Sequence, residues 1–256
     1  MGLSPGAGVG EKVAADIAIR TMGYGVERVR RWYGSYDLLI LGMERAGKTS
    51  FFNFLRRKLL ATDGEPTPPT LDDVNTGVFS FEWTTDQGIL GLELRNVGDR
   101  SGQVGPNEHA KMFVTRKPHL LVVVLDVTRD DRTSDTLHGS YERWFEWFCS
   151  YVAERLMNRP RLARRVHSRL RQMIVLLNKS DALPPHDRDN AIRRAQDSVR
   201  AELRTRLRAH LGPKVDQFPI LPCSIVRNPQ NGRSPEETAS LLQEAVRQMV
   251  LSTGVG

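Results

Sequence analysis

The stretch Gly42-Met43-Glu44-Arg45-Ala46-Gly47-Lys48-Thr49 decides the fold of this chain. It has the spacing G-x-x-x-x-G-K-T of the P-loop, in which glycines let successive backbone N–H groups turn inward around a phosphate. The apolar run from Asp37 to Leu41 before it is typical of a short buried strand, and Thr49 to Leu60 after it has apolar and basic residues at helical spacing. Strand, loop and helix in this order are the context that the pattern requires, whereas a chance glycine turn does not need them.

The residue types in this loop suit specific contacts with a nucleoside triphosphate. We predict that Lys48 reaches the β- and γ-phosphates and takes part in catalysis, and that the hydroxyl of Thr49 binds Mg²⁺. The positive end of the following helix adds to the anion site. The residues of this segment that we expect to contact the nucleotide are Gly42, Met43, Glu44, Arg45, Ala46, Gly47, Lys48, Thr49 and Ser50.

The composition bounds the class of protein. The chain has 256 residues, a formal net charge of +7 and two cysteines, Cys149 and Cys223. The cysteines form neither a disulfide framework nor a zinc pattern, and the first residues lack the features of a secretory signal, so we expect a cytoplasmic protein. The charge favours acidic partners such as nucleic acid, anionic lipid or an acidic protein face, although a solvated basic surface explains it equally well.

Strand and helix patterns alternate along the rest of the chain, which predicts an α/β fold with a mostly parallel six-stranded sheet flanked by helices. The expected strands are residues 37–41, 78–83, 89–97, 120–127, 173–177 and 218–221. The expected helices are residues 48–60, 134–157, 161–171, 187–211 and one that opens with the capping box from Ser234, with room for another between 99 and 120.

We expect two parts in this chain: an N-terminal segment, residues 1–35, that is partly disordered or helical, and one domain, residues 36–252. Residues 11–33 place apolar residues loosely on one helical face with arginines around it. Such a basic amphipathic element can make a peripheral membrane contact. Packing against the chain's own domain is the interpretation that we favour.

The sequence Asn178-Lys179-Ser180-Asp181 follows a predicted strand and reads N-K-x-D. A carboxylate can accept hydrogen bonds from both the N1–H and the 2-amino group of guanine, donors that adenine does not offer in that arrangement. A base that leaves the carboxylate unpaired is rejected. We therefore predict that Asp181 selects guanine, that Asn178 ties this loop to the P-loop and the base, and that Lys179 lies over the ring.

The sequence Asp99-Arg100-Ser101-Gly102-Gln103 reads D-x-x-G-Q after another predicted strand. We expect Asp99 to hold Mg²⁺ through water, the N–H of Gly102 to contact the γ-phosphate, and Gln103 to orient the attacking water as a catalytic residue. An alternative register, Asn96-Val97-Gly98-Asp99, resembles a decayed version of such a motif. The first register is preferred because it supplies every functional residue at once.

These three motifs, in this order, resemble those of the Ras/Arf superfamily of small GTPases over about residues 36 to 250. Glu44 stands where the Arf-like branch has an acidic residue, so the resemblance is closest to that branch. The segment Thr67-Pro68-Pro69-Thr70 is similar to the first-switch segment of that branch. The resemblance implies Thr70 as the second hydroxyl on Mg²⁺, with Thr67 and Thr76 as competitors.

The resemblance also implies the kind of site and its partners. Cys223-Ser224 is similar to the short loop whose backbone N–H reads O6 of guanine. The implied domain is a P-loop NTPase G domain that binds GTP and GDP with Mg²⁺ and hydrolyses GTP slowly as a molecular switch. The implied partners are protein effectors and an activating partner that completes the site.

Two features depart from that pattern. Residues 155–171 and 188–208 form basic helical insertions, which can bind RNA phosphates or form a solvated face, and we favour the solvated face. Arg45 brings a cation into the P-loop. It can act as an arginine finger on the oxygen between the β- and γ-phosphates, or face solvent paired with Glu44, which is the interpretation that we prefer.

The leading hypothesis is thus a regulatory GTPase. One alternative is a nucleotide-locked interaction subunit that binds GTP with little hydrolysis, against which Gln103 argues. Another is a basic RNA- or ribosome-associated GTPase, whose sign is a steep salt dependence of RNA binding. The segment from Asn178 to Asp181 speaks against a P-loop kinase or ATPase.

Overall fold

The computed structural model describes residues 33–52, 74–76, 79–85, 88–99, 105–129 and 139–225, and describes side chains within 37–52, 105–129 and 139–225. Thr70, Gly102, Gln103, the N-terminal segment before residue 33 and the helix predicted from Ser234 lie outside the described residues.

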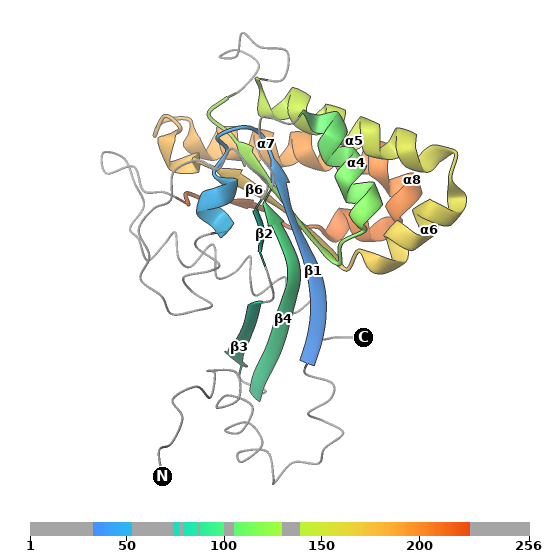
Figure 1. Ribbon diagram of the computed structural model, residues 1–256. Helices are drawn as coiled ribbons and strands as arrows, with labels where there is room; N and C mark the ends of the chain where they lie inside the picture. The colour runs from blue at the N-terminus through green and yellow to red at the C-terminus, as the bar shows by residue number, and fades with distance from the viewer. Residues whose placement is uncertain are drawn as a thin grey trace, which may run out of the picture.

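Five parallel strands form the centre of the sheet, in the order β4-β1-β5-β6-β7 (Figure 1). Their bounds are β1 Tyr33–Gly42, β4 Gly88–Asp99, β5 Leu120–Asp126, β6 Gln172–Asn178 and β7 Ile220–Pro222. Every residue of β5 is buried, as is all of β6 except its first residue. Near-continuous apolar runs suit parallel strands that are covered on both faces, so the predicted α/β fold with a parallel sheet is confirmed.

An antiparallel edge completes the sheet beside β4. Both β2 (Val74–Thr76) and β3 (Phe79–Thr85) pair with β4 in antiparallel orientation. Thr76 lies opposite Val97 and Phe79 lies opposite Leu94, so both strands follow one register along the same side of β4. The sheet therefore has seven strands rather than the six predicted, because a short strand precedes the expected hairpin.

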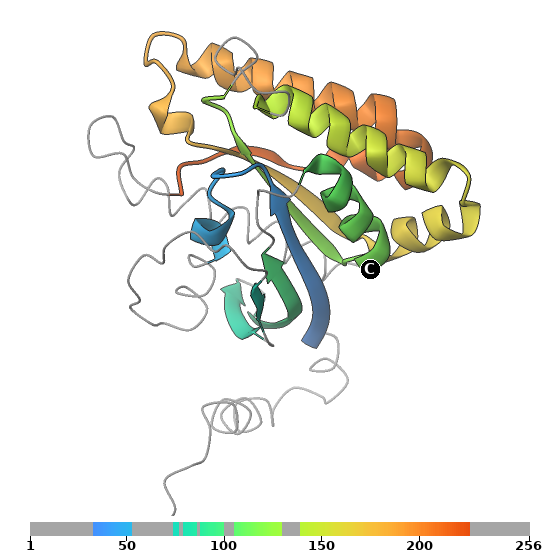
Figure 2. The same ribbon diagram turned by 45° about the horizontal axis from the view of Figure 1, so that its top comes forward.

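The described helices cover one face of the sheet, whereas the first turn after the P-loop, residues 48–52, lies on the other face (Figures 1 and 2). α5 packs against both α4 and α7, and α6 packs against α8. None of these helices combines the length and the apolar composition that crossing a bilayer requires. The bounds are α4 Pro106–Arg116, α5 Tyr141–Met157, α6 Pro160–Arg169, α7 Arg188–Glu202 and α8 Arg208–Leu211.

Local chemistry sets where these helices begin and end. α5 begins at Tyr141 rather than at residue 134 as predicted, because the hydroxyl of Ser140 accepts the backbone N–H of Arg143 at 3.2 Å and caps the helix. Pro160 opens α6, where its missing N–H costs nothing. The helix predicted over residues 187–211 is divided, since a π-helical turn at Leu203–Leu207 separates α7 from α8.

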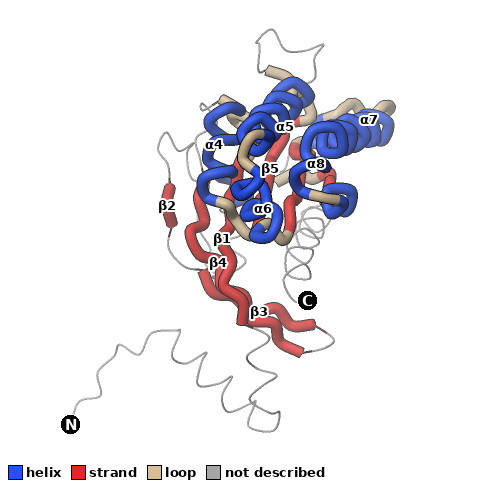
Figure 3. Tube along the Cα trace, turned by 90° about the vertical axis from the view of Figure 1, so that its right-hand side faces the viewer, coloured by secondary structure: helices blue, strands red, loops and turns tan. Residues whose placement is uncertain are grey.

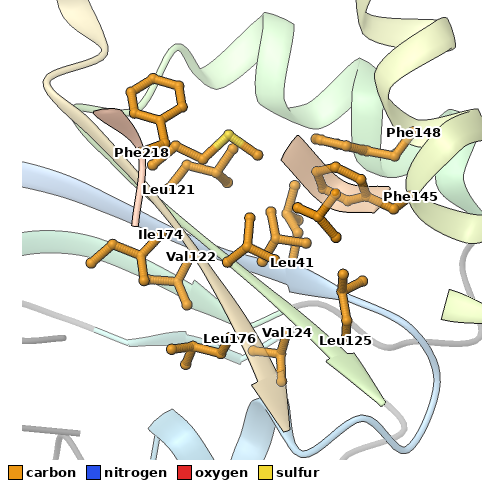
Figure 4. Close-up of a cluster of buried hydrophobic side chains, with 14 of the residues drawn as sticks. Leu41, Leu121, Val122, Val124, Leu125, Phe145, Phe148, Ile174, Leu176 and Phe218 are labelled. Atoms are coloured by element: carbon orange, nitrogen blue, oxygen red, sulfur yellow. The ribbon is translucent and has the colours of Figure 1, made fainter. Parts of the chain in front are cut away.

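The core fills the space between the sheet and this helical layer. Side chains of β5 and β6 meet Phe145 and Phe148 of α5, and Phe218 lies in the same cluster just before β7 (Figure 4). The apolar residues of β5 and β6 and these three phenylalanines are each at most 1% exposed, so the core around the central strands is closely packed. This packing holds the carboxyl ends of the parallel strands at one edge.

Candidate nucleotide-binding site

The predicted motifs meet at the carboxyl edge of the parallel strands. Gly42 lies beside Val124 of β5, Asp126 beside Asn178 of β6, and Leu177 beside Pro222 of β7. On the other side of β1, the backbone of Asp99 at the end of β4 pairs with Ile40. Ligands of open α/β sheets bind in the crevice outside this edge.

Two glycines of the P-loop occupy positions that other residues cannot take. Gly42 has φ of 150°, and a Cβ there would lie 2.1 Å from the carbonyl oxygen of Val124. Gly47 has φ of 96°, and a Cβ there would lie 2.4 Å from Nδ2 of Asn178. Both are positive φ values that disfavour a side chain, and both close approaches join the loop to neighbouring strands.

Lys48 is held inside the loop rather than in solvent. Its side chain belongs to a residue that is 5% exposed, and its Nζ donates a hydrogen bond of 2.7 Å to the carbonyl oxygen of Met43. The helix starts at Lys48, and its first bond runs from the N–H of Phe51 to the carbonyl of Gly47 at 2.9 Å. One short segment thus carries the ammonium group, the N-terminus of the helix and the half-buried Thr49 and Ser50. These are the groups that an anion site requires.

Asn178 joins three segments that are far apart in sequence. Its Nδ2 donates to the carbonyl of Ala46 in the P-loop at 2.7 Å, while its Oδ1 accepts the backbone N–H of Ile225 at 2.9 Å. The thiol of Cys223 also donates to Oδ1, at 3.8 Å. The side chain is 3% exposed, so these are buried hydrogen bonds and costly to remove. The contact to the P-loop is the one expected from the sequence.

Asp181 and Ser224 are a buried pair at the same edge. Asp181 is 2% exposed, the hydroxyl of Ser224 donates to its Oδ1, and its own N–H donates to Oγ of Ser224 at 3.1 Å. The carbonyl of Cys223 accepts both the N–H and the hydroxyl of Ser180, at 3.1 and 3.0 Å. These bonds fix the N-K-S-D loop on the loop after β7.

The thiol of Cys223 has a structural rather than a reactive character. Burial, with a smaller contribution from the charge of Asp181, raises the pKa of this thiol well above its ordinary value. Because its pKa is raised, the thiol of Cys223 stays protonated at neutral pH. Only the thiolate is nucleophilic, so Cys223 acts as a small apolar group with a weak hydrogen-bond donor.

Lys179 is fixed by a residue that the sequence reasoning missed. Its backbone has φ of 62°, and its Nζ donates to Oδ2 of Asp126 at 2.5 Å. Asp126 is 1% exposed, and its Oδ1 accepts the N–H and the hydroxyl of Thr128 at 3.2 and 2.6 Å. The sequence does contain a sign of this role, because Asp126 is a carboxylate at the end of the otherwise apolar strand β5.

The exposed part of the P-loop is its Glu44-Arg45 tip. The side chain of Arg45 is 85% exposed and lies 3.7 Å from a carboxylate oxygen of Glu44, which is the pairing that we preferred. The backbone of Arg45 has a positive φ of 56°. Arg129, which sequence reasoning also missed, donates from Nη1 to the carbonyl of Glu44 at 3.3 Å and holds the tip against the loop after β5.

The remaining predicted residues are placed only in part. The backbone of Asp99 ends β4 at this edge, and its side chain lies outside the described set. Thr49 is the one predicted Mg²⁺ ligand whose side chain falls within the described residues. Hydroxyl and carboxylate oxygens together with phosphates are ligands that suit Mg²⁺, so the predicted donor set fits this metal.

Comparison with known proteins adds little to this geometry. No family model matches the chain, and a search of curated proteins finds no match. Among solved structures, translation elongation factor SelB from Methanococcus maripaludis is similar in its apo form, at 12% identity and a TM-score of 0.45 over 86% of this chain and 33% of that one. Its complex with the GTP analogue GppNHp is similar at 15% identity and a TM-score of 0.44, over 86% and 34%.

The chain thus spans about a third of the length of these factors. Likeness at such a TM-score carries no functional argument. The resemblance of the motifs to the Ras/Arf superfamily, and to its Arf-like branch, therefore stays a prediction.

Proposed function

We propose that this chain binds Mg²⁺·GTP at the carboxyl edge of its sheet and hydrolyses the γ-phosphate as a slow regulatory switch. The observation that carries the proposal is the side chain of Asn178. It links the phosphate-binding loop, through Ala46, to the loops that hold Asp181 and Ser224. This link supports the proposal that a loop suited to phosphate and a carboxylate suited to guanine belong to one site.

The chemistry of each end follows from its groups. Backbone N–H groups of residues 44–49 and the ammonium of Lys48 would surround the phosphates, where the Nζ–Met43 bond already holds that ammonium inside the loop. Asp181, positioned by Ser224, would accept the two donors of guanine. The stem of Lys179, whose amine is anchored on Asp126, would lie over the base.

In this proposal Thr49, Thr70 and Asp99 would hold Mg²⁺, which would supply charge neutralisation at the β- and γ-phosphates. Gln103 orients the attacking water, and the N–H of Gly102 contacts the γ-phosphate. Ordering of the segment around residues 61–77, and of the part of residues 99–117 that precedes α4, by that phosphate would present a surface to protein effectors, and hydrolysis would release it.

Nucleotide analysis of the purified protein tests the proposal. The protein is denatured, its bound nucleotide is separated by chromatography, and GTP hydrolysis is then followed with and without Mg²⁺. We expect bound GDP and turnover on the order of 10⁻⁴ to 10⁻² per second. Bound GTP that persists would favour the nucleotide-locked subunit, and a protein that neither carries nor binds guanine nucleotide would overturn the proposal.

A further inference from the structure

A second basic region lies at the opposite edge of the sheet from the nucleotide site. α6 leads into the amino end of β6, and the N–H of Arg171 donates to the carbonyl of His119, the residue before β5, at 2.8 Å. α6 packs beside α8 at one end of the helical layer (Figure 3). The Asn178 loop follows the other end of the same strand.

This region carries positive charge without acidic neighbours in sequence. No aspartate or glutamate occurs from Arg155 to Ser180. Five arginines here are exposed and make no ion pair with any residue whose side chain is described. We call them the α6 patch: Arg159, Arg161, Arg164, Arg165 and Arg171.

Three members of the patch share one face of the helix. Arg161, Arg164 and Arg165 are spaced three and four residues apart, so they are neighbours on the helix surface. The apolar face is already used, since Val166 is fully buried and Leu162 packs against the core. The outward face is therefore a row of guanidinium groups along a helix about 15 Å long.

The other basic helix of the chain behaves differently. On α7 and the π-helical turn that follows it, Arg194 pairs with Asp187, Arg204 with Asp216 at 2.7 Å, and Arg206 with Glu146 at 2.8 Å. Arg208 lies 3.7 Å from Asp216. The charges of these arginines are paired with carboxylates of the chain itself, whereas the α6 patch makes no such pair within the described residues.

The surroundings of the patch narrow the kind of partner. An interfacial helix anchors in a membrane by inserting its apolar face, whereas the apolar face of α6 is buried in the chain's own core and leaves only charge for a lipid surface. Protein interfaces depend on clusters of aromatic and aliphatic anchors, whereas the one exposed large hydrophobic side chain among those described is Met157, two residues before Arg159. A surface of forked cations with a single apolar side chain at its margin complements a regular row of phosphates.

We propose that the α6 patch binds the phosphate backbone of nucleic acid, at the edge of the sheet remote from the nucleotide site. Contacts to phosphates position a protein without reading sequence, so no sequence preference is expected. The proposal does not depend on guanine nucleotide binding, because the two sets of residues are separate.

The test compares two variants of the full chain that lose the same charge. One replaces Arg161, Arg164 and Arg165 by glutamine; the control replaces Arg193, Arg194 and Arg208, which are also exposed and carry the same total charge, by glutamine. Glutamine keeps helix propensity, so both variants should fold, as circular dichroism and the melting temperature will check. The probe is a fluorescent RNA duplex of about 20 base pairs, titrated by anisotropy over a salt series.

We expect the logarithm of the wild-type association constant to fall with the logarithm of salt with a slope of about −3 or steeper, since each contacted phosphate contributes about −0.9 in a duplex. The α6 variant should lose at least about tenfold in affinity at low salt, with a slope shallower by about 2 to 3. The control should keep the wild-type slope within about one unit.

Three results would overturn the proposal. Equal losses in both variants would mean that only net charge matters. Wild-type protein that ignores RNA but binds vesicles rich in phosphatidylserine, in an α6-dependent way, would assign the patch to a membrane. Wild-type protein that binds neither probe would leave the patch as a solvated face. GDP binding should be unchanged in both variants, which separates this test from that of the proposed function.

Discussion

The two ends of the parallel sheet both gather positive charge, yet they do so by opposite means. At the carboxyl end, one ammonium group, that of Lys48, is buried and hydrogen-bonded inside a loop whose shape depends on Gly42 and Gly47. At the amino end, five arginines of the α6 patch stand in solvent. The first arrangement suits a single anion held in one place, whereas the second suits a long row of phosphates.

The two ends differ because of how deeply their cations are buried rather than because of how many cations they have. A charge pair near the surface is screened by water and salt, but the same pair in a dry site is several times stronger. The P-loop itself contains both cases: Lys48 is 5% exposed, whereas the side chain of Arg45 is 85% exposed. We therefore expect a small ligand to depend on Lys48 and to be indifferent to exposed arginines, including Arg45.

The largest effect should come from Lys48→Ala. Removing the only buried cation of the loop should weaken binding of Mg²⁺·GDP and Mg²⁺·GTP by about a hundredfold or more, since a hydrogen bond to a charged group contributes about 1.5–3 kcal/mol and the phosphates here carry several charges. Titration with a fluorescent guanine nucleotide measures it. Binding of the RNA duplex should not change.

The matched control is Lys111→Ala on α4, an exposed lysine that pairs with Glu108 at 3.3 Å. It should leave nucleotide binding unchanged. Retained guanine nucleotide binding by Lys48→Ala, or a loss of similar size in Lys111→Ala, would break the contrast between the buried and the exposed cation.

An intermediate effect is expected from Asn178→Ala. The change leaves the carbonyl of Ala46 and the N–H of Ile225 without their buried partner, at about 1–3 kcal/mol each. The free energy of unfolding should therefore fall by about 2–6 kcal/mol, and GDP should dissociate about tenfold faster because the two halves of the site lose their link. Urea unfolding and stopped-flow release of labelled GDP measure the two quantities.

Asn158→Ala is the control for that link, because Asn158 is an exposed residue at the end of α5. Its effect on GDP release should be negligible. A destabilised Asn178→Ala protein that nevertheless releases GDP at the wild-type rate would show that the link serves the fold and not the site.

The smallest effect should come from Arg45→Ala. Its guanidinium is exposed and lies near Glu44, so we expect single-turnover hydrolysis to change by less than about twofold. Quenched-flow measurement with radiolabelled GTP gives the rate. A loss of about tenfold or more would instead assign Arg45 to the arginine-finger role and would place an exposed cation in the chemistry.

The sequence is sufficient to predict the parts of the site that are set by short motifs and the strands directly before them. The P-loop and the N-K-x-D segment each follow an apolar strand, and the pairing of parallel strands then brings Gly42 and Asn178 to one edge without further information. The cap at Ser140 and the π-helical turn were less accessible, because each depends on a few hydrogen bonds that no hydrophobic pattern reveals.

The sequence could not show which charged side chains pair with each other, because their partners are distant in the chain. Both basic segments are rich in arginine, and the sequence shows only that residues 155–180 have no carboxylate of their own. It does not show that Arg206 reaches Glu146, 60 residues away, whereas the arginines of the α6 patch find no carboxylate among the described side chains. Asp126 acquires its role only when β5 and β6 pair in the observed register and bring Lys179 over it.

The most direct test of the account is the base selectivity of Asp181→Asn. The amide of asparagine places a donor opposite a donor of guanine, whereas the same amide complements the extra carbonyl of xanthine. We therefore expect the preference to move from GDP to XDP by a factor of at least about a hundred. Competitive titration of GDP, XDP and ADP measures the ratio, with Asp197→Asn on the exposed face of α7 as the control. A gain of XDP binding cannot come from misfolding. If Asp181→Asn instead keeps wild-type selectivity for guanine, the assignment of Asp181 as the base-reading residue, and with it the proposed site, is contradicted.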